Sequence, residues 1–130
     1  MVHLDTSTVV AHLRGNQFAA GRLAAALPEV AVSTIVLAEL IFGVRVSARP
    51  DENLARLREF VELVDLVVFD SACADAYGSI RAAQRRSGRP VGEADAPIAA
   101  TALSHRATLV THNLRHFEGI DGLTIEDWLV

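Results

Sequence analysis

Three acidic residues in otherwise apolar surroundings are the side chains of this sequence best suited to chemistry: Asp5, Glu39 and Asp95. Asp5 follows a short apolar run, Glu39 is the only charged residue between positions 33 and 44, and Asp95 precedes the apolar segment 96–103. A buried carboxylate either shifts its pKa or acquires a cation. Three carboxylates close together repel one another unless a positive charge lies between them. A hard divalent cation such as Mg²⁺ meets that need, so these acids predict a magnesium site if the fold gathers them.

The elements that must position these acids follow from the hydrophobic pattern, in which short β-rich runs alternate with longer helical stretches. Strands are predicted at 2–4, 30–32, 66–69, 108–111 and 123–125, and helices at 6–13, 18–26, 34–46, 52–64, 71–87 and 96–106. Ser33, Ser71 and Asp95 are the predicted caps of three of the helices. This alternation predicts an α/β fold, with a parallel sheet covered by helices on both faces. A length of 130 residues without internal repeats or linkers predicts one domain over 1–130.

Ligand sites in such sheets lie at the carboxyl ends of the strands. Asp5 ends the first predicted strand, Asn113 follows the fourth, and Glu39 lies less than two turns into the helix after the second. Asp95 begins the helix before the fourth strand, and periodicity alone does not show that this helix start reaches the same edge. Asp5 and Asp95 could each simply cap a helix. Glu39 lies within a helix, so capping does not explain it, and a glutamate at the margin of a buried helix is its alternative.

Four hydroxyl and amide side chains near the acids could take part in the same site. Thr6, Ser7 and Thr111 could orient carboxylates by hydrogen bonds. Asn113 is a typical turn residue, but its amide oxygen could also bind a metal or a metal-bound water.

The charge of the chain bears on its partners. A net charge of −4 argues against nucleic acid, but the location of charge matters more than its sum. All twelve basic residues are arginine, and Arg81, Arg85, Arg86 and Arg89 fall within nine positions. Guanidinium groups suit phosphate, so this cluster is a candidate contact for an RNA backbone. A solvated helix face is the alternative.

Composition also bears on the compartment. Cys73 is the single cysteine, so an internal disulfide is excluded, and a small buried side chain is expected there. The apolar runs are too short to span a bilayer, and the chain has no basic leader. We therefore expect a cytoplasmic protein without a membrane partner.

Four segments in order resemble the motifs of PIN domains: VHLDTS at 2–7, STIVLAEL at 33–40, GEADAPIAATAL at 92–103 and LVTHNLRHF at 109–117. The likeness is greatest to VapC-type toxins of bacterial toxin–antitoxin pairs and runs from residue 2 to about residue 129. It implies a PIN-like three-layer α/β/α sandwich with a central parallel sheet of about five strands. It also implies an endoribonuclease that uses Mg²⁺ or Mn²⁺.

The resemblance assigns the site acids to Asp5, Glu39 and Asp95, with Asn113 at a fourth position that is often acidic. A neutral residue there leaves the number of metals open, and Glu93 could compensate. The metal would polarise the phosphate and activate a water, without a covalent intermediate. The resemblance further implies a small antitoxin and a homodimer, with helices 34–46 and 52–64 as candidate surfaces.

Other functions remain as alternatives. A PIN-like module could bind RNA or a partner without cleaving it. A receiver-like phosphoacceptor would be expected to use a lysine, and the chain has none. An aspartyl phosphatase normally has a second aspartate two residues after the first, where this chain has Ser7. A zinc site at His112 and His116 lacks the HExxH pattern.

Overall fold

The computed structural model describes residues 1–89, 92 and 94–130, and a parallel five-stranded sheet forms its centre. The strands lie in the order β3-β2-β1-β4-β5, and their bounds are β1 Val2–Leu4, β2 Val30–Ser33, β3 Asp65–Val67, β4 Thr108–Val110 and β5 Ile125–Glu126. The first strand is therefore the central one. The chain runs outward from β1 through β2 to β3, then crosses over to β4 on the other side of β1.

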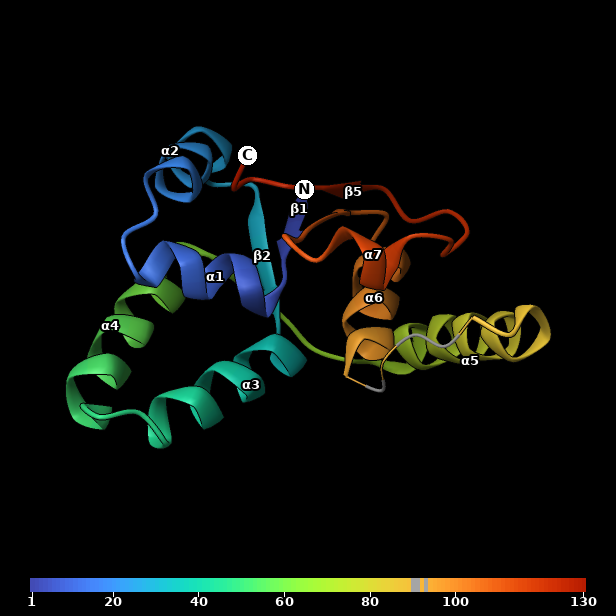
Figure 1. Ribbon diagram of the computed structural model, residues 1–130, viewed down its shortest axis with the longest axis horizontal. Coiled ribbons are helices and arrows are strands. Elements are labelled where there is room, and N and C mark those ends of the chain that lie inside the picture. The colour runs from blue at the N-terminus through green and yellow to red at the C-terminus, as the bar shows by residue number, and fades with distance from the viewer. Residues whose placement is uncertain (90–91, 93) are drawn as a thin grey trace.

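Helices cover both faces of the sheet, as the alternating pattern predicts (Figure 1). One face carries α1 (Thr6–Leu13), α2 (Gln17–Ala26), α3 (Thr34–Arg45) and α4 (Pro50–Leu63), and the other carries α5 (Ser71–Ser87), α6 (Asp95–Ser104) and α7 (Leu114–Phe117). Crossovers between parallel strands are right-handed, so reversing the direction of travel across the sheet changes the face that the helices cover. The predicted three-layer α/β/α architecture is confirmed.

The predicted boundaries are confirmed within three residues, but two of the predicted caps are wrong. Ser33 caps α3, since its hydroxyl accepts from the backbone N–H of Val36 at 3.2 Å. Asp70 rather than Ser71 caps α5, because its carboxylate precedes the first helical residue and accepts from the N–H of Cys73 at 3.0 Å. Asp95 does not cap α6. It is the first residue of that helix, and its side chain is paired elsewhere.

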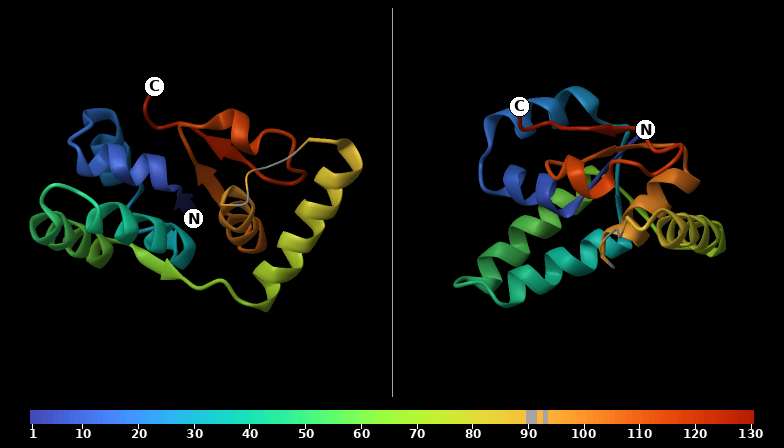
Figure 2. Two further views of the ribbon diagram at one scale, coloured as in Figure 1. Left: turned by 60° about the horizontal axis from the view of Figure 1, so that its bottom comes forward. Right: turned by 45° about the vertical axis from the view of Figure 1, so that its right-hand side comes forward.

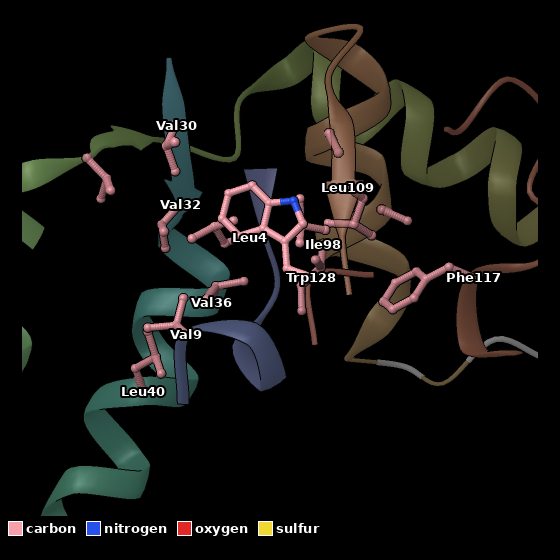
Figure 3. Packing of buried hydrophobic residues seen from close by; sticks show 14 of the residues in the cluster. Leu4, Val9, Val30, Val32, Val36, Leu40, Ile98, Leu109, Phe117 and Trp128 are labelled. Carbon is pink, nitrogen blue, oxygen red and sulfur yellow. The ribbon is translucent and has the colours of Figure 1, made fainter. Parts of the chain in front are cut away.

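The core is built on the central strands, whose side chains are buried on both faces (Figure 3). Leu4 and Leu109 come from neighbouring strands, and Val36 and Ile98 pack from helices on opposite faces. Burying each such side chain contributes about 1.5–3 kcal/mol. Trp128 joins this cluster from the C-terminal segment, and its indole N–H donates to Glu126 at 2.8 Å. The packed strands give the side chains at their carboxyl ends a fixed support.

Two expectations from composition can also be compared with the structure. Cys73 is fully buried, as expected for a small apolar side chain. Within the described residues, none of the helices is both long enough and apolar enough to cross a membrane.

Candidate active site

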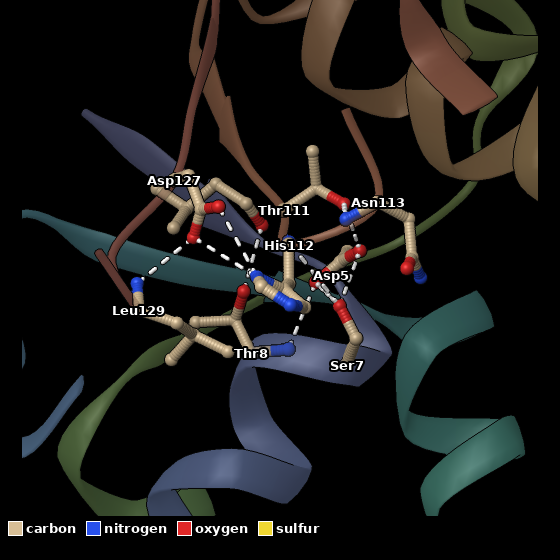
Figure 4. Close-up of polar contacts among 9 residues, drawn as sticks. Asp5, Ser7, Thr8, Thr111, His112, Asn113, Asp127 and Leu129 are labelled. Atoms are coloured by element: carbon tan, nitrogen blue, oxygen red, sulfur yellow. Dashed lines mark hydrogen bonds and ion pairs between the residues drawn. The ribbon is translucent and has the colours of Figure 1, made fainter. Parts of the chain in front are cut away.

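Asp5 lies between β1 and α1 and is the most strongly hydrogen-bonded acid of the site (Figure 4). It caps α1, since its Oδ1 accepts from the N–H of Thr8 at 3.0 Å. It also accepts from the hydroxyl of Ser7 at 2.9 Å and from that of Thr111 at 2.5 Å. Only 4% of Asp5 is exposed. A helix cap needs one such bond, so the two hydroxyls do more than capping requires and hold the carboxylate in one orientation.

Thr111 connects Asp5 to the end of β4. The strands β1 and β4 are neighbours, and the N–H of Asp5 donates to the carbonyl of Val110 at 2.9 Å. The hydroxyl of Thr111 in turn accepts from the N–H of Asn113 at 3.0 Å. Asn113 therefore lies at the same edge as Asp5. This edge, between β1 and β4, is where the direction of strand order reverses, the usual place for a ligand site in such a sheet.

Glu39 reaches the same edge from α3. Its Oε1 accepts from the hydroxyl of Thr6 at 2.8 Å, and Thr6 directly follows Asp5. The two residues are 33 positions apart in the chain, so packing of α1 against α3 brings them together. The polar side chain of Glu39, within an apolar helix, is thus turned toward the acid cluster.

Asp95 begins α6, and Oδ2 of its carboxylate lies 3.0 Å from Nδ1 of His116 in α7. Burial raises the pKa of Asp95, the charge and hydrogen bond of His116 lower it, and the negative charge of Asp5 raises it again. Because the charge of Asp5 acts on Asp95, the two carboxylates lie in one region. The helix α6 leads into the N-terminal end of β4, so its own N-terminus lies at the carboxyl edge of the sheet. The question that the sequence left open is thereby answered.

The donor set fits a hard divalent cation. Carboxylates and hydroxyls supply oxygen ligands. Burial raises the pKa of Asp95, so a cation beside this carboxyl group would favour its ionised form. Within residues 1–89, 92 and 94–130, however, no three His, Cys, Asp or Glu side chains converge closely enough to surround one ion. The acids therefore share a region without forming a closed ligand shell. Glu93, the candidate additional acid, lies outside the described residues.

The contact of His116 with Asp95 and the helix α7 are the parts of the site that the sequence did not indicate. The predicted elements end at residue 111 and resume at 123, and nothing local to His116 points to a contact with Asp95. His112 pairs with a different acid, its Nδ1 lying 3.1 Å from Oδ2 of Asp127. Because the two histidines have different carboxylate partners, the arrangement does not support a zinc site between them.

The four clustered arginines do not share one environment. Arg81 packs on Tyr77, with its guanidinium carbon 5.6 Å from the ring centroid and Nη1 donating to the phenol at 3.0 Å. Arg86 and Arg89 instead line a pocket on the other side of α5. Arg85 is exposed on the same helix.

An acid cluster at the switch point of a parallel α/β/α sheet is an arrangement typical of metal-dependent nucleases. The sequence matches the PIN domain family over residues 2–123, which is nearly the whole chain. The chain belongs to this family.

Similar proteins of known description show which kind of PIN domain this chain is. A "tRNA(fMet)-specific endonuclease VapC" from Shigella flexneri is 43% identical over 100 residues, which are 77% of this chain and 76% of the relative. A protein of the same description from Salmonella typhimurium is 37% identical over 126 residues, or 96% of each chain. A crystal structure of DNA-bound VapBC from Salmonella typhimurium superposes with a TM-score of 0.93 at 37% identity, covering 98% of this chain and 99% of that one. Within the PIN domains, the chain is a VapC-type ribonuclease, which favours RNA cleavage over a phosphoacceptor, a phosphatase or a passive binding module.

Proposed function

We propose that one PIN domain spanning residues 1–130 hydrolyses RNA with the help of Mg²⁺ or Mn²⁺ held by Asp5, Glu39 and Asp95. The observation that carries this proposal is the buried carboxylate of Asp5, which hydroxyls from both sides of the sheet's switch point hold in place. Burial raises the pKa of Asp95, with a smaller contribution from the charge of Asp5, so a cation between the two carboxylates would favour their ionised forms. When bound, the metal would polarise the scissile phosphate and lower the pKa of the attacking water.

Each side chain of the site has a proposed role that follows from its position. Asp5 and Asp95 act as metal ligands, and Glu39 binds the metal directly or through a water. The amide oxygen of Asn113 positions a metal or a water. The hydroxyls of Thr6, Ser7 and Thr111 orient the carboxylates, as their hydrogen bonds indicate. Of the four clustered arginines, Arg86 and Arg89, which line the pocket beside α5, supply positive charge for the RNA backbone, whereas Arg81 packs on Tyr77.

The names of the relatives suggest the substrate to test first. Proteins 43% and 37% identical to this chain are tRNA(fMet)-specific endonucleases, so we propose initiator tRNA as the substrate and the cytoplasm as the place of action.

A small VapB-type antitoxin is the proposed inhibitor, since the similar Salmonella structure is a VapBC complex. We also propose a homodimer. Exposed apolar side chains on α3, on the residue that follows it and on α4 support a protein interface on these helices: Phe42 and Val46 are each 69% exposed and Leu63 is 55% exposed.

The decisive experiment is cleavage of initiator tRNA by the full chain in Mg²⁺ and in EDTA. We expect cleavage only with the metal, inhibition by a VapB-type antitoxin, and complete loss of cleavage in Asp5→Asn, Glu39→Gln and Asp95→Asn with circular dichroism unchanged. Asp75→Asn removes one charge from the exposed surface of α5 and serves as the matched control. Cleavage in EDTA would refute the metal requirement, and full activity of any of the three variants would remove that residue from the site.

A further inference from the structure

A pocket of about 960 Å³ lies between the second half of α5 and the segment that contains α7 and residues 118–121. The left view of Figure 2 shows the loop after α7 on the same side of the molecule as this part of α5. Pockets that hold small ligands usually measure about 300–1,000 Å³, so this one is at the large end of that range. The pocket is partly open to solvent, so an extended chain could enter it. The wall is mixed: Ile80, Leu103 and Ile120 are apolar, and the remaining lining residues are mostly polar or charged.

The positive charge of the pocket comes from Arg86, Arg89 and Arg115, and its acids are Glu118 and Asp121. In the described part of the chain, no carboxylate lies within 4 Å of any of these three guanidinium groups. Arg89 extends from the end of α5 toward the opposite wall, where a Cβ on Gly119 would lie 3.5 Å from its Nη1. The guanidinium groups are therefore free of internal ion pairs with described residues, and they project from both walls.

One lining residue also has an unused hydrogen-bond donor. The amide nitrogen of Gln84 is buried, and it has no partner among the described residues. A buried donor without an acceptor costs about 1–3 kcal/mol. Because this nitrogen is buried, a phosphodiester or a nucleobase in the pocket would reach it only if the side chain of Gln84 rotated toward the cavity.

The pocket adjoins the acid site through a single side chain. His116 lines the pocket, and the same imidazole contacts Asp95 at 3.0 Å. A strand with its scissile phosphate at the acids would therefore pass His116 and enter the pocket next. The acids repel a polyanion, whereas the arginines of the pocket attract one, and this difference favours binding of the flanking phosphates there.

We propose that this pocket, with Arg86, Arg89 and Arg115, binds the backbone of the RNA strand on one side of the scissile phosphate. The proposal rests on the proposed ribonuclease function and makes it more specific. It adds Arg115 to the RNA-binding residues, and it excludes Arg81, which packs on Tyr77, and Arg85, which is not part of the pocket.

The test measures RNA binding in EDTA, where the proposed cleavage is blocked. Binding is monitored by the fluorescence anisotropy of two labelled RNAs, initiator tRNA and a 12-nucleotide oligouridylate, at several NaCl concentrations. The pocket variant is the double variant Arg86→Gln/Arg115→Gln. The control pair is the double variant Arg81→Gln/Arg85→Gln, which removes the same amount of positive charge from the same region. We expect the pocket variant to raise Kd at least tenfold. Its salt slope should fall by about 1.4, because each single-strand phosphate contact contributes about 0.7. The control pair should change Kd less than twofold, and both variants should keep the wild-type melting curve.

Equal losses in the two pairs would overturn the proposal, since they would show a general charge effect. Unchanged RNA binding by the pocket variant would also overturn it. If that variant binds RNA normally but loses affinity for a VapB-type antitoxin, the pocket is a protein interface instead. Failure of the wild-type chain to cleave RNA in Mg²⁺, with binding in EDTA intact and dependent on the pocket, would refute the nuclease function and leave the RNA-binding pocket standing.

Discussion

Oδ2 of Asp95 lies 3.0 Å from Nδ1 of His116, and this contact joins the first turn of α6 to the short helix α7. The imidazole opposes the two influences that raise the pKa of Asp95, namely burial and the charge of Asp5. His116 is therefore the partner of a carboxylate to which we assign metal binding. The same pair separates the acid site from the arginine-lined pocket.

The raised pKa of Asp95 leads to a prediction about stability. A carboxyl group whose pKa is higher in the folded than in the unfolded state disfavours folding once the pH exceeds its unfolded value of 3.8. Asp95→Asn should therefore be at least as stable as the wild type at pH 7 in EDTA. A metal that binds only the folded wild type adds about 2.7 kcal/mol at 100 times its Kd, so excess Mg²⁺ should reverse the order. Urea unfolding measures both, and equal stabilisation of the two proteins by Mg²⁺ would contradict the assignment.

The hydroxyl of Thr111 should matter to both stability and cleavage. Thr111→Val keeps the shape of the side chain but removes the donor to Asp5 and the acceptor for the N–H of Asn113. We expect a loss of about 1–3 kcal/mol in the free energy of unfolding. Cleavage should fall about 10–100-fold, as is typical when the partner of a metal ligand is removed.

Thr101→Val is the matched control for that variant. Thr101 is equally buried, and its hydroxyl donates to the carbonyl of Pro97 at 2.8 Å within α6. It should lose stability without losing cleavage, both measured under the same conditions. If the two variants cleave equally well, Thr111 has no orienting role.

Asn113→Asp should tighten Mg²⁺ binding measured by calorimetry, because it adds a negative oxygen ligand at the edge that carries Asp5. Asn16→Asp adds the same charge at the N-cap of α2, where aspartate is an equally good cap, and should leave the affinity unchanged. Equal metal affinity of Asn113→Asp and the wild type would place residue 113 outside the ligands.

The lowered pKa of His3 in β1 leads to the prediction that the protein loses stability in acid. Burial lowers its pKa from 6.5 to about 4, with smaller contributions from the charges of His105 and the N-terminus, and its ring lies 5.4 Å from that of His105. Below pH 6.5 the unfolded chain takes up this proton and the folded protein does not. The free energy of unfolding thus falls by on the order of 3 kcal/mol between pH 7 and pH 4. The difference in unfolding free energy between His3→Leu and the wild type should stay constant above pH 7 and grow in favour of His3→Leu as the pH falls. Parallel curves in urea titrations would contradict this.

Local patterns in the sequence were enough to predict most elements and to single out the three acids as candidates, but not the contacts of those acids. Alternating hydrophobic runs place β1 and α1 correctly because each is encoded within a few residues. The partner of Glu39 is 33 positions away, and that of Asp95 is 21 positions away, so both depend on how helices pack. The helix α7 has four residues, too short for a periodic pattern to reveal. Asp70 and Ser71 are neighbours and either could cap α5, so the sequence alone did not show that Asp70 is the N-cap.

The central position of β1 has a consequence for biosynthesis. A ribosome makes Asp5 among the first residues, but the strand that pairs with β1 on one side, and the hydroxyl of Thr111 that orients Asp5, come more than a hundred residues later. A nascent chain therefore carries Asp5 and Glu39 without the ordered site for most of its synthesis. Premature termination before β4 should yield fragments that are harmless to RNA, and translation itself delays the toxicity of the enzyme until the chain is nearly finished.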